Sequence, residues 1–524
     1  MRNGRLIIHK TIFCVGKVIY ICCPIKTENG ILLIKVMIIN DTIFKEDNVI
    51  LNLIDIIENG KESFILATEI PNAVFPAKMT INTDGTYDIE FYVSEKYTSQ
   101  ITGEFFFTHH IILATKGLNL LIQNKDIKSC KQQIASKDGN YKTVLNVVAF
   151  RGDLDDSLWS NSKQVAFCSI LEKRFAPYQA GVVFDMTISE NQTSSCKNCI
   201  KLDIYSNCFL IYFIKTDNNK QYLILKSQKD VNHDTFLEVS ECVRTTIGLL
   251  SGYYISDSVW YVAMRSNDKK SLTFRFENNG NSVYNNHPLL EYKHYENVSE
   301  NKLKLSSEQF ENMVRLFFIN KEIRRSAQLL IYAGNSDGVS RGCLAAVALE
   351  TIKSQIIQNE IDKSSESIID NKELLSQIKR ELSKSLAKFK NAIDKKTYTR
   401  LETKLGQIYQ VSNSEKLEAP FEKLGIKLSA EESYCLTCRN FLLHGASLKT
   451  KEGLYEFLNQ HELVDMISNR LIMLTAMLIL KKCGYNGMIV DWGYTEIAKW
   501  RMILAREIVP GGKVLRDISE QNID

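Results

Sequence analysis

The sequence carries little net charge, few prolines and no framework of regularly spaced cysteines. Its 524 residues include 65 Lys and Arg against 61 Asp and Glu, so the net charge of +4 does not mark a general nucleic-acid binder, and any basic surface must be local. Hydrophobic residues form 44% and charged residues 24% of the chain, as in ordinary folded domains, although only 7 prolines occur. Disordered, collagen-like and low-complexity classes are therefore excluded. At roughly 100 to 200 residues per domain, the length predicts two to four domains.

The sequence predicts no membrane span. Residues 13–23 are interrupted by Lys17 and fall short of the roughly 20 residues that a spanning helix needs, so we expect a strand there. Residues 471–480 lie inside a longer amphipathic pattern between Arg470 and Lys481. They predict a buried helix of a bundle, and we expect no contact of the chain with a membrane.

The 13 cysteines are odd in number and irregularly spaced in a large chain, which argues against a secreted disulfide framework and predicts a cytoplasmic location. Two pairs, Cys196/Cys199 and Cys435/Cys438, have the spacing of a zinc knuckle. They lie in different predicted domains, and neither is followed in the sequence by a second nearby Cys or His pair. We therefore expect thiols, with no metal and no cofactor.

Up to about residue 300, short apolar runs alternate with polar residues and are separated by turn sequences such as Glu28-Asn29-Gly30. Helical spacing predicts one helix in this region, at residues 236–250, with Gly252 as its terminator. The sequence therefore predicts a β-rich, sandwich-like region that is one domain or two, split near residues 120–150. Its predicted strands cover residues 31–39, 64–68, 88–93, 181–188, 199–204, 209–214, 222–226 and 271–276.

After Ser306 the alternation gives way to long helical patterns. The fold class predicted for the whole chain is α+β multidomain, with a β-rich region over residues 1–300 and an all-α helical bundle over residues 301–524. Helices are predicted near residues 307–333, 340–358, 370–409, 430–444, 454–482 and 494–508.

Residues 371–410 are the most basic stretch, with ten Lys or Arg against four Asp or Glu. A solvated helix face or a helical hairpin explains such a charge excess, and so does a surface that contacts phosphates. The sequence leaves both interpretations open.

The sequence lacks a Walker phosphate loop, a dinucleotide fingerprint, a Gly-x-Ser-x-Gly elbow and a paired-carboxylate metal motif. Most familiar enzyme classes lose support. The remaining candidate is the segment Arg439-Asn440-Phe441-Leu442-Leu443-His444-Gly445, which ends a helix that Ser429-Ala430-Glu431-Glu432 begins with a capping box. We expect His444 in the last turn, where the helix dipole favours positive charge and suits a histidine that both accepts and donates protons.

On a straight helix, Arg439 is rotated by about 140° from His444, whereas Asn440 and His444 share a face. Arg439 and His444 converge on one phosphate only if the helix end loosens or if a second copy of the chain supplies its own pair. We therefore expect a homodimer or a higher homo-oligomer formed through the helical half. These side chains suit metal-free RNA cleavage, in which His444 moves protons at the ribose 2′-hydroxyl or the leaving oxygen and Arg439 stabilises charge on the phosphate. The alternative is an ordinary helix end, with Arg439 paired to an acid and His444 solvated.

The segment Arg439 to Gly445 resembles the R-N-x3-H-G form of the motif that marks the HEPN superfamily, and the resemblance covers about residues 305–510. It implies a bundle of four to five helices that is often an RNase, with the site formed across a dimer interface. It also implies that Arg439 and His444 are the catalytic pair and that Asn440 supports them.

Two further segments are similar to parts of this family. Residues 344–350 resemble its first bundle helix, which commonly carries a glutamate pointing towards the site. Glu350 matches that glutamate, while a solvent-facing role remains open from the residues alone. Residues 421–425 resemble the connector before the motif helix in the Apea-like HEPN group of bacterial anti-phage and abortive-infection proteins, which also have a β-rich N-terminal region.

Together these features predict a cytoplasmic, metal-independent endoribonuclease that acts as a regulated toxin or abortive-infection effector. RNA is the expected substrate of the helical half, and a phage-derived trigger is expected to act on residues 1–300. The alternative is a catalytically silent HEPN-like module for dimerisation or RNA binding, with the β-rich half as a ligand-binding domain.

Overall fold

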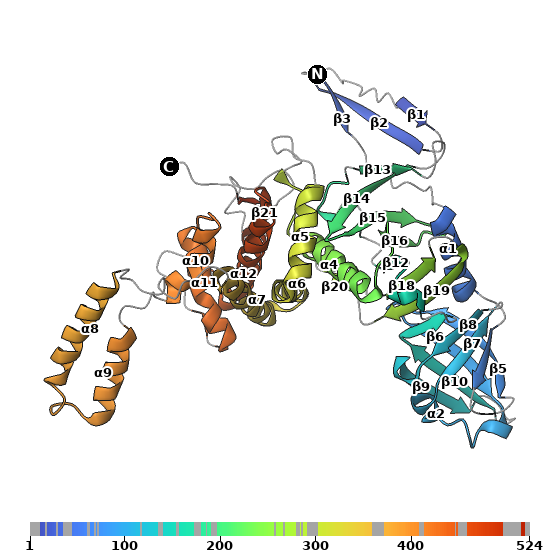
Figure 1. Cartoon of the computed structure of the whole chain (residues 1–524), viewed down its shortest axis with the longest axis horizontal. Helices are drawn as coiled ribbons and strands as arrows, with labels where there is room; N and C mark the ends of the chain where they lie inside the picture. Colours follow the sequence, from blue (N-terminus) through green and yellow to red (C-terminus); the bar gives the residue numbers. More distant parts are fainter. Residues whose placement is uncertain are drawn as a thin grey trace. The chain divides into compact units, whose positions relative to one another are not determined.

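The computed structural model of the chain divides into two compact units, which are Met1–Ile319 and Asn320–Asp524 (Figure 1). The first unit is rich in strands and the second is mostly helical, so the predicted α+β multidomain fold class is confirmed. The structure describes residues 11–15, 18–27, 30–34, 45–59, 63–67, 70, 73–115, 118–134, 140–152, 157–171, 175, 180–184, 186–189, 196–255, 258–265, 268–278, 283–284, 287–290, 302–358, 371–407, 413–445, 447–448, 458–495 and 515–518.

Fifteen strands of the first unit follow one another in a single hydrogen-bonded order, with every described pairing antiparallel. The order is β13-β14-β15-β16-β12-β18-β19-β11-β8-β7-β4-β5-β6-β10-β9. These strands are β4 (Ser63–Ala67), β5 (Val74–Ile81), β6 (Tyr87–Val93), β7 (Ile111–Thr115), β8 (Leu118–Ile122), β9 (Ile127–Ile134), β10 (Tyr141–Val147), β11 (Ala149–Gly152), β12 (Lys163–Ile170), β13 (Met186–Ser189), β14 (Cys196–Ile204), β15 (Asn207–Lys215), β16 (Gln221–Ser227), β18 (Ser258–Arg265) and β19 (Asp268–Asn278).

Alternating apolar residues give this sheet its buried face. In β6, Tyr87, Ile89, Phe91 and Val93 are all fully buried, while the residues between them are partly or fully exposed. The ring of Tyr87 also packs edge-on against Trp260 of β18, with 6.4 Å between centroids. Since β6 and β18 stand far apart in the strand order, the sheet curves back on itself around one core.

Two smaller sheets complete the first unit. The strands β1 (Thr11–Val15), β2 (Val18–Thr27) and β3 (Gly30–Ile34) form an antiparallel group, and β17 (Tyr253–Tyr254) pairs with β20 (Val283–Tyr284). The single strand predicted over residues 13–23 is therefore wrong in detail, because β1 and β2 are separate strands of a hairpin, with Val15 opposite Val18.

The helices of the first unit are α1 (Lys45–Asn59), α2 (Phe105–Thr108), α3 (Ser157–Ser160), α4 (His233–Ser251) and α5 (Ser307–Ile319). The helix predicted at residues 236–250 is confirmed as α4. Its terminator is also confirmed, because Gly252 adopts a left-handed φ of 70°. Sequence reasoning missed α1, whose Ile50, Ile54 and Ile57 recur at helical spacing and are buried.

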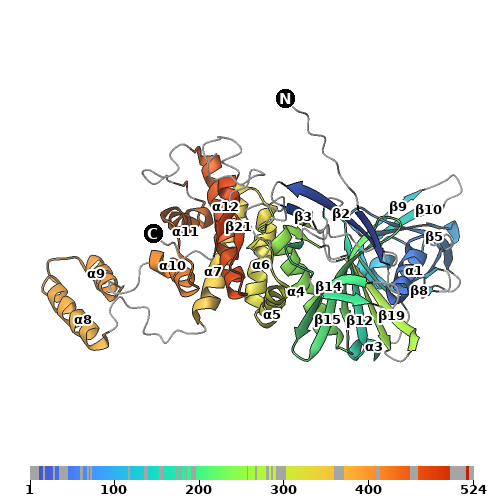
Figure 2. The ribbon, with the colours of Figure 1, turned by 90° about the horizontal axis from the view of Figure 1, so that it is seen from above.

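The second unit is a helical bundle built around α7 (Gly338–Gln358), which contacts α6 (Lys321–Gly334), α10 (Asn413–Lys423), α11 (Ala430–Leu443) and α12 (Gln460–Lys482). Figure 2 shows α6, α7 and α12 side by side. The remaining elements are α8 (Lys372–Ala387), α9 (Lys395–Gln407) and the paired strands β21 (Met488–Val490) and β22 (Leu515–Asp517).

Two of the predicted helices are each divided in the structure. The pattern over residues 307–333 breaks into α5 and α6, because Asn320 caps the start of α6 and its side chain accepts a hydrogen bond from the backbone N–H of Ile323. The pattern over residues 370–409 breaks into α8 and α9, because Asp394 caps α9 in the same way. The helix α10 was not predicted, and most of the helix predicted at residues 494–508 lies outside the described residues.

Among the described residues, α12 alone has the length and apolar composition that a membrane span requires. However, 83% of its most apolar window is buried inside the protein, and a core helix passes the same test of composition. The prediction that residues 471–480 belong to a buried bundle helix is confirmed.

Candidate functional site

The helix α11 carries the Arg439-to-His444 segment, and its two ends are fixed by the residues that the sequence indicates. Ser429 and Glu432 form the predicted capping box, since each side chain accepts a hydrogen bond from the backbone N–H of the other. Gly445 follows the helix with a left-handed φ of 64°. The helix ends at Leu443, so His444 lies one residue beyond the predicted last turn, as the C-cap with φ −100° and ψ 4°.

Arg439 points from α11 towards α7, where it meets Glu350. Their Nη1 and Oε1 atoms are 2.6 Å apart, and the Arg439 side chain is only 12% exposed. The approach is not aligned for a hydrogen bond, and both Glu350 Oε1 and Arg439 Nε are buried with no hydrogen-bond partner among the described residues. Lys353, one turn along α7, places its Nζ 3.5 Å from the other oxygen of Glu350. The charge of Glu350 therefore holds the guanidinium of Arg439 in place, while the Nε–H group has no hydrogen-bond acceptor among the described residues.

Asn440 and His444 lie on a different side of α11 from Arg439. Both are exposed, and the backbone N–H of His444 donates to the carbonyl oxygen of Asn440 at 3.1 Å. Within the described part of the chain, the His444 side chain makes no hydrogen bond or ion pair. The structure thus brings Arg439 and Glu350 together, and it presents Asn440 and His444 to solvent.

Close packing of three helices holds this arrangement. A methyl group at Gly342 of α7 would lie 2.6 Å from Ser468 Oγ of α12 and 2.7 Å from Leu442 Cδ1 of α11, so only glycine fits there without a shift. The neighbouring Cys343 thiol donates to the carbonyl oxygen of Leu442 at 3.2 Å. The last turn of α11 therefore packs directly against α7, the helix that carries Glu350.

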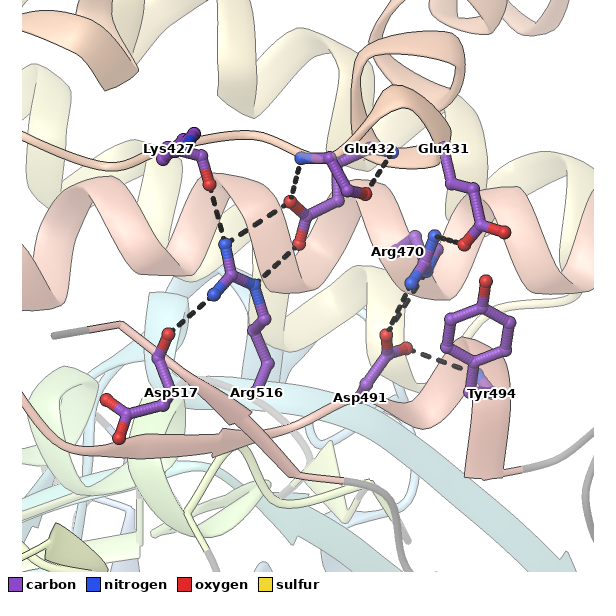
Figure 3. A network of polar contacts seen from close by, with 9 residues as sticks. Lys427, Glu431, Glu432, Arg470, Asp491, Tyr494, Arg516 and Asp517 are labelled. Carbon is purple, nitrogen blue, oxygen red and sulfur yellow. Dashed lines mark hydrogen bonds and ion pairs between the residues drawn. The ribbon is translucent and has the colours of Figure 1, made fainter. Parts of the chain in front are cut away.

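A buried arginine supports α11 at its other end (Figure 3). The Arg470 side chain of α12 is 4% exposed and pairs with Asp491 at 2.9 Å and with Glu431 of α11 at 3.4 Å. Its guanidinium also lies 4.0 Å from the centroid of the Tyr494 ring. Sequence reasoning did not assign Arg470 a role, although a charged residue beside a long apolar run was a usable signal.

The C-terminal strand β22 reaches the same helix end through Arg516. Its Nε lies 2.9 Å from Oε1 of Glu432, a carboxylate that is almost fully buried, and a second nitrogen donates to the carbonyl oxygen of Lys427 (Figure 3). Glu432 thus serves both the capping box and this ion pair. Sequence reasoning missed Arg516, which lies 84 residues from Glu432 and gives no local signal.

The two candidate knuckles belong to different units of the chain. Cys435 and Cys438 are buried in α11, and burial raises the pKa of Cys435 to about 12 and also raises the pKa of Cys438. Cys199 is buried in β14, whereas the side chain of Cys196 lies outside the described residues. Within the described ranges, no group of three or more His, Cys, Asp or Glu is placed to hold a metal ion.

The first unit contains a separate pocket of about 240 Å³ between α1 and the turn that joins β15 to β16. Asp55, Glu58, Asp217 and Lys220 line it, and Glu58 pairs with Lys220 and accepts a hydrogen bond from the Tyr87 hydroxyl at 2.8 Å. Tyr222 also lines the pocket and is 3% exposed, and its hydroxyl has no hydrogen bond among the described residues. Burial, followed by the charges of Glu58 and Asp55, raises the pKa of Tyr222.

In comparisons with protein families, curated proteins and solved structures, the chain matches none.

Proposed function

We propose that this protein is a metal-independent endoribonuclease of the HEPN type and that its helical unit carries the active site. The observation that supports this proposal best is the different placement of Arg439 and His444 on α11. Arg439 is held by Glu350 with its Nε–H group unsatisfied, while His444 is exposed just past the helix end beside Asn440. A charge stabiliser and a proton-transfer group are the two parts that cleavage of a ribose phosphate needs.

In the proposed reaction, His444 takes the proton from a ribose 2′-hydroxyl, and the 2′-oxygen attacks the adjacent phosphorus. Arg439 stabilises the negative charge that builds up on the phosphate oxygens. The bond to the 5′-oxygen then breaks, and that oxygen receives a proton from an imidazolium. The products are a 2′,3′-cyclic phosphate and a 5′-hydroxyl. Asn440 orients the reacting groups, and Glu350 positions Arg439.

A homodimer is part of this proposal. Arg439 turns inward to α7, whereas His444 faces solvent, so one α11 presents the two side chains in different directions. A second copy that places its own exposed His444 beside the same phosphate supplies both a proton acceptor and a proton donor. The reaction needs both roles, because the 2′-hydroxyl loses a proton and the leaving oxygen gains one.

The β-rich unit is the proposed regulatory part. A ribonuclease that damages host RNA must stay inactive until a signal arrives, and we assign the recognition of a phage-derived trigger to residues 1–319. The proposed setting is the bacterial cytoplasm, with the protein acting as a toxin or abortive-infection effector.

The direct test uses the purified full-length chain and a labelled RNA in buffer that contains EDTA. We expect cleavage that persists in EDTA and yields 5′-hydroxyl ends, and we expect Arg439→Ala and His444→Ala each to slow it by about 100-fold or more. A strict requirement for Mg²⁺, or 5′-phosphate ends, would rule out the mechanism. A phage lysate added to one arm supplies the trigger if the isolated protein is held inactive.

The second candidate function is a ligand-binding protein whose HEPN-like unit serves for dimerisation or RNA binding without cleavage. The acidic pocket beside Tyr222 favours this reading, because the Tyr222 hydroxyl has no hydrogen bond among the described residues and could bind a ligand in the pocket. Under this alternative, Arg439→Ala and His444→Ala leave any protective phenotype intact, while Tyr222→Phe reduces it.

A further inference from the structure

The helices α8 and α9 form a hairpin within the second unit (Figure 1). From residue 373 to residue 405, not one described side chain is buried. Four large apolar side chains are exposed as well, including Phe389, which is 56% exposed in the turn between the helices. A surface of this kind does not contribute to the core of the bundle, so its charges and apolar groups remain available for another molecule.

Two of the four acids of the hairpin, Glu381 and Asp394, interact within the hairpin itself. Asp394 accepts hydrogen bonds from the backbone N–H groups of Lys396 and Thr397, both at 3.0 Å, and so caps α9. Glu381 pairs with Lys384 at 3.0 Å and lies 4.0 Å from Arg380. These carboxylates are therefore committed to local structure.

The cations of the hairpin are not matched in this way. Residues 371–410 contain ten Lys or Arg against four acids, an excess of six. Among the residues that the structure describes, six of these cations are exposed and form no ion pair, and they cluster in the turn and along α9. They are Lys388, Lys390, Lys395, Lys396, Arg400 and Lys404.

An exposed aromatic ring lies among these charges. Phe389 stands directly between Lys388 and Lys390, and all three are exposed. Lysines that contact phosphates beside an aromatic ring that stacks on a base are the combination by which proteins hold single-stranded nucleic acid. A duplex would offer such a ring no free base.

The candidate active site has little unpaired positive charge that could bind RNA phosphates. Arg439 and Lys353 both lie against Glu350, and Arg439 is the only cation in α11, whose first turn carries Glu431 and Glu432. Most of the affinity for a polyanion must therefore come from other residues of the chain.

We propose that the α8–α9 hairpin binds the single-stranded RNA substrate, with its unpaired cations on the phosphates and Phe389 stacked on a base. This inference rests on the proposed ribonuclease function and names the surface that captures its substrate. A second copy of the hairpin is a poor occupant, because two surfaces that each carry six excess positive charges repel one another. Anionic lipid would also attract these lysines, and the experiment separates it from RNA.

The test uses the full-length chain with His444→Ala, which keeps the RNA intact, and measures binding of a fluorescent single-stranded RNA by anisotropy at several salt concentrations. The first variant adds Lys388→Gln, Lys390→Gln, Lys395→Gln and Lys396→Gln, and the second adds Phe389→Ala. The matched control adds four exposed substitutions on the other unit, which are Lys125→Gln, Lys128→Gln, Lys131→Gln and Lys229→Gln.

We expect the hairpin lysine variant to bind RNA at least about tenfold more weakly than the control, and to lose about three units of the slope of log affinity against log salt. Phe389→Ala should weaken binding by about fivefold or more. Equal affinity of the hairpin variant and the control overturns the proposal. The proposal is also overturned, in favour of a membrane surface, if the control binds vesicles with roughly 30% phosphatidylserine and the hairpin variant loses that binding while its RNA binding is unchanged.

The same lysine substitutions in the chain with His444 intact separate this inference from the proposed function. Cleavage that persists at saturating RNA but weakens at low RNA supports both. If the variant cleaves RNA and its RNA affinity is unchanged, the ribonuclease proposal is supported and the hairpin proposal is contradicted. If the protein never cleaves RNA but the hairpin variant loses RNA binding, the hairpin proposal is supported and the ribonuclease proposal is contradicted.

Discussion

Arg439 and Glu350 form the contact that ties the motif helix to its neighbour, with 2.6 Å between Nη1 of the arginine and Oε1 of the glutamate. The two residues are 89 positions apart, yet both belong to the small set singled out from the sequence. An ordinary ion-paired helix end would show the same contact. What separates the two interpretations is the effect of these residues on RNA, compared with their effect on stability.

For His444 we expect a large loss of activity without a loss of stability. The side chain is exposed and makes no hydrogen bond or ion pair with described residues, so His444→Ala should change the free energy of unfolding by less than about 0.5 kcal/mol. RNA cleavage should fall by about 100-fold or more, since a positioned acid or base contributes at least that much. His461→Ala removes another exposed histidine of the same unit and should leave cleavage unchanged.

For Glu350 we expect a positioning effect. Glu350→Gln removes the charge beside Arg439, and the exposed fraction of its side chain, 37%, limits the loss of stability to about 1 kcal/mol. Cleavage should slow by about tenfold. In a double-mutant cycle with Arg439→Ala, the effects on cleavage should not add, because both changes disturb the same guanidinium. Additive effects would show that Glu350 acts independently of Arg439.

The buried pair of Arg516 and Glu432 should matter for stability. Arg516→Ala leaves the Glu432 carboxylate, which is 1% exposed, with the backbone N–H of Ser429 as its remaining partner among the described residues. Breaking such a pair should cost about 3 kcal/mol of unfolding free energy, as measured by urea denaturation. Arg380→Ala in α8 removes an exposed ion pair and should cost less than about 0.5 kcal/mol. Similar values for the two variants would contradict a structural role for Arg516.

His233 should make the first unit sensitive to acid. Its Nδ1 lies 2.8 Å from Oε1 of Gln164, whose amide nitrogen donates to the carbonyl of Val231, so Nδ1 must carry the proton of a neutral ring. Burial, followed by the charge of Arg275, lowers the pKa of His233 to about 4. Between about pH 6.5 and pH 4 the unfolded chain binds a proton that the folded chain does not, so stability falls as the pH falls.

The size of this effect is up to about 3 kcal/mol at pH 4, relative to a variant without the titrating ring. Urea denaturation of the wild type and of His233→Gln at several pH values measures the difference. We expect the stability gap between the two proteins to shrink from pH 7 to pH 4. A constant gap would show that His233 does not titrate abnormally in the folded state.

The sequence predicted the two halves of the fold well, because alternation and helical periodicity are properties of short windows. It failed where one residue interrupts a longer pattern. Asn320 and Asp394 both cap helices inside stretches that otherwise read as continuous helices. Of the strand predicted at residues 181–188, the structure describes residues 186–188 as part of β13, Met186–Ser189, and Val182 in an isolated bridge with Leu305. A window of average hydrophobicity does not register such local hydrogen bonds.

The candidate site was predictable only where its parts are local. The capping box at Ser429, the terminator Gly445 and the opposed directions of Arg439 and His444 all follow from spacing on one helix. The buried support of that helix by Arg470 and Arg516 depends on contacts between distant segments. Hydrophobic periodicity in a short window does not depend on contacts between distant segments, so the sequence did not predict them.

The central claim is tested most directly in growing cells. Wild type, Arg439→Ala and His444→Ala are induced to matched protein levels, with and without phage challenge, while growth and the 5′-hydroxyl ends of total RNA are recorded. The ribonuclease account predicts arrested growth and new 5′-hydroxyl ends in the wild type alone. Protection against phage that survives both substitutions, with no new RNA ends, would contradict it.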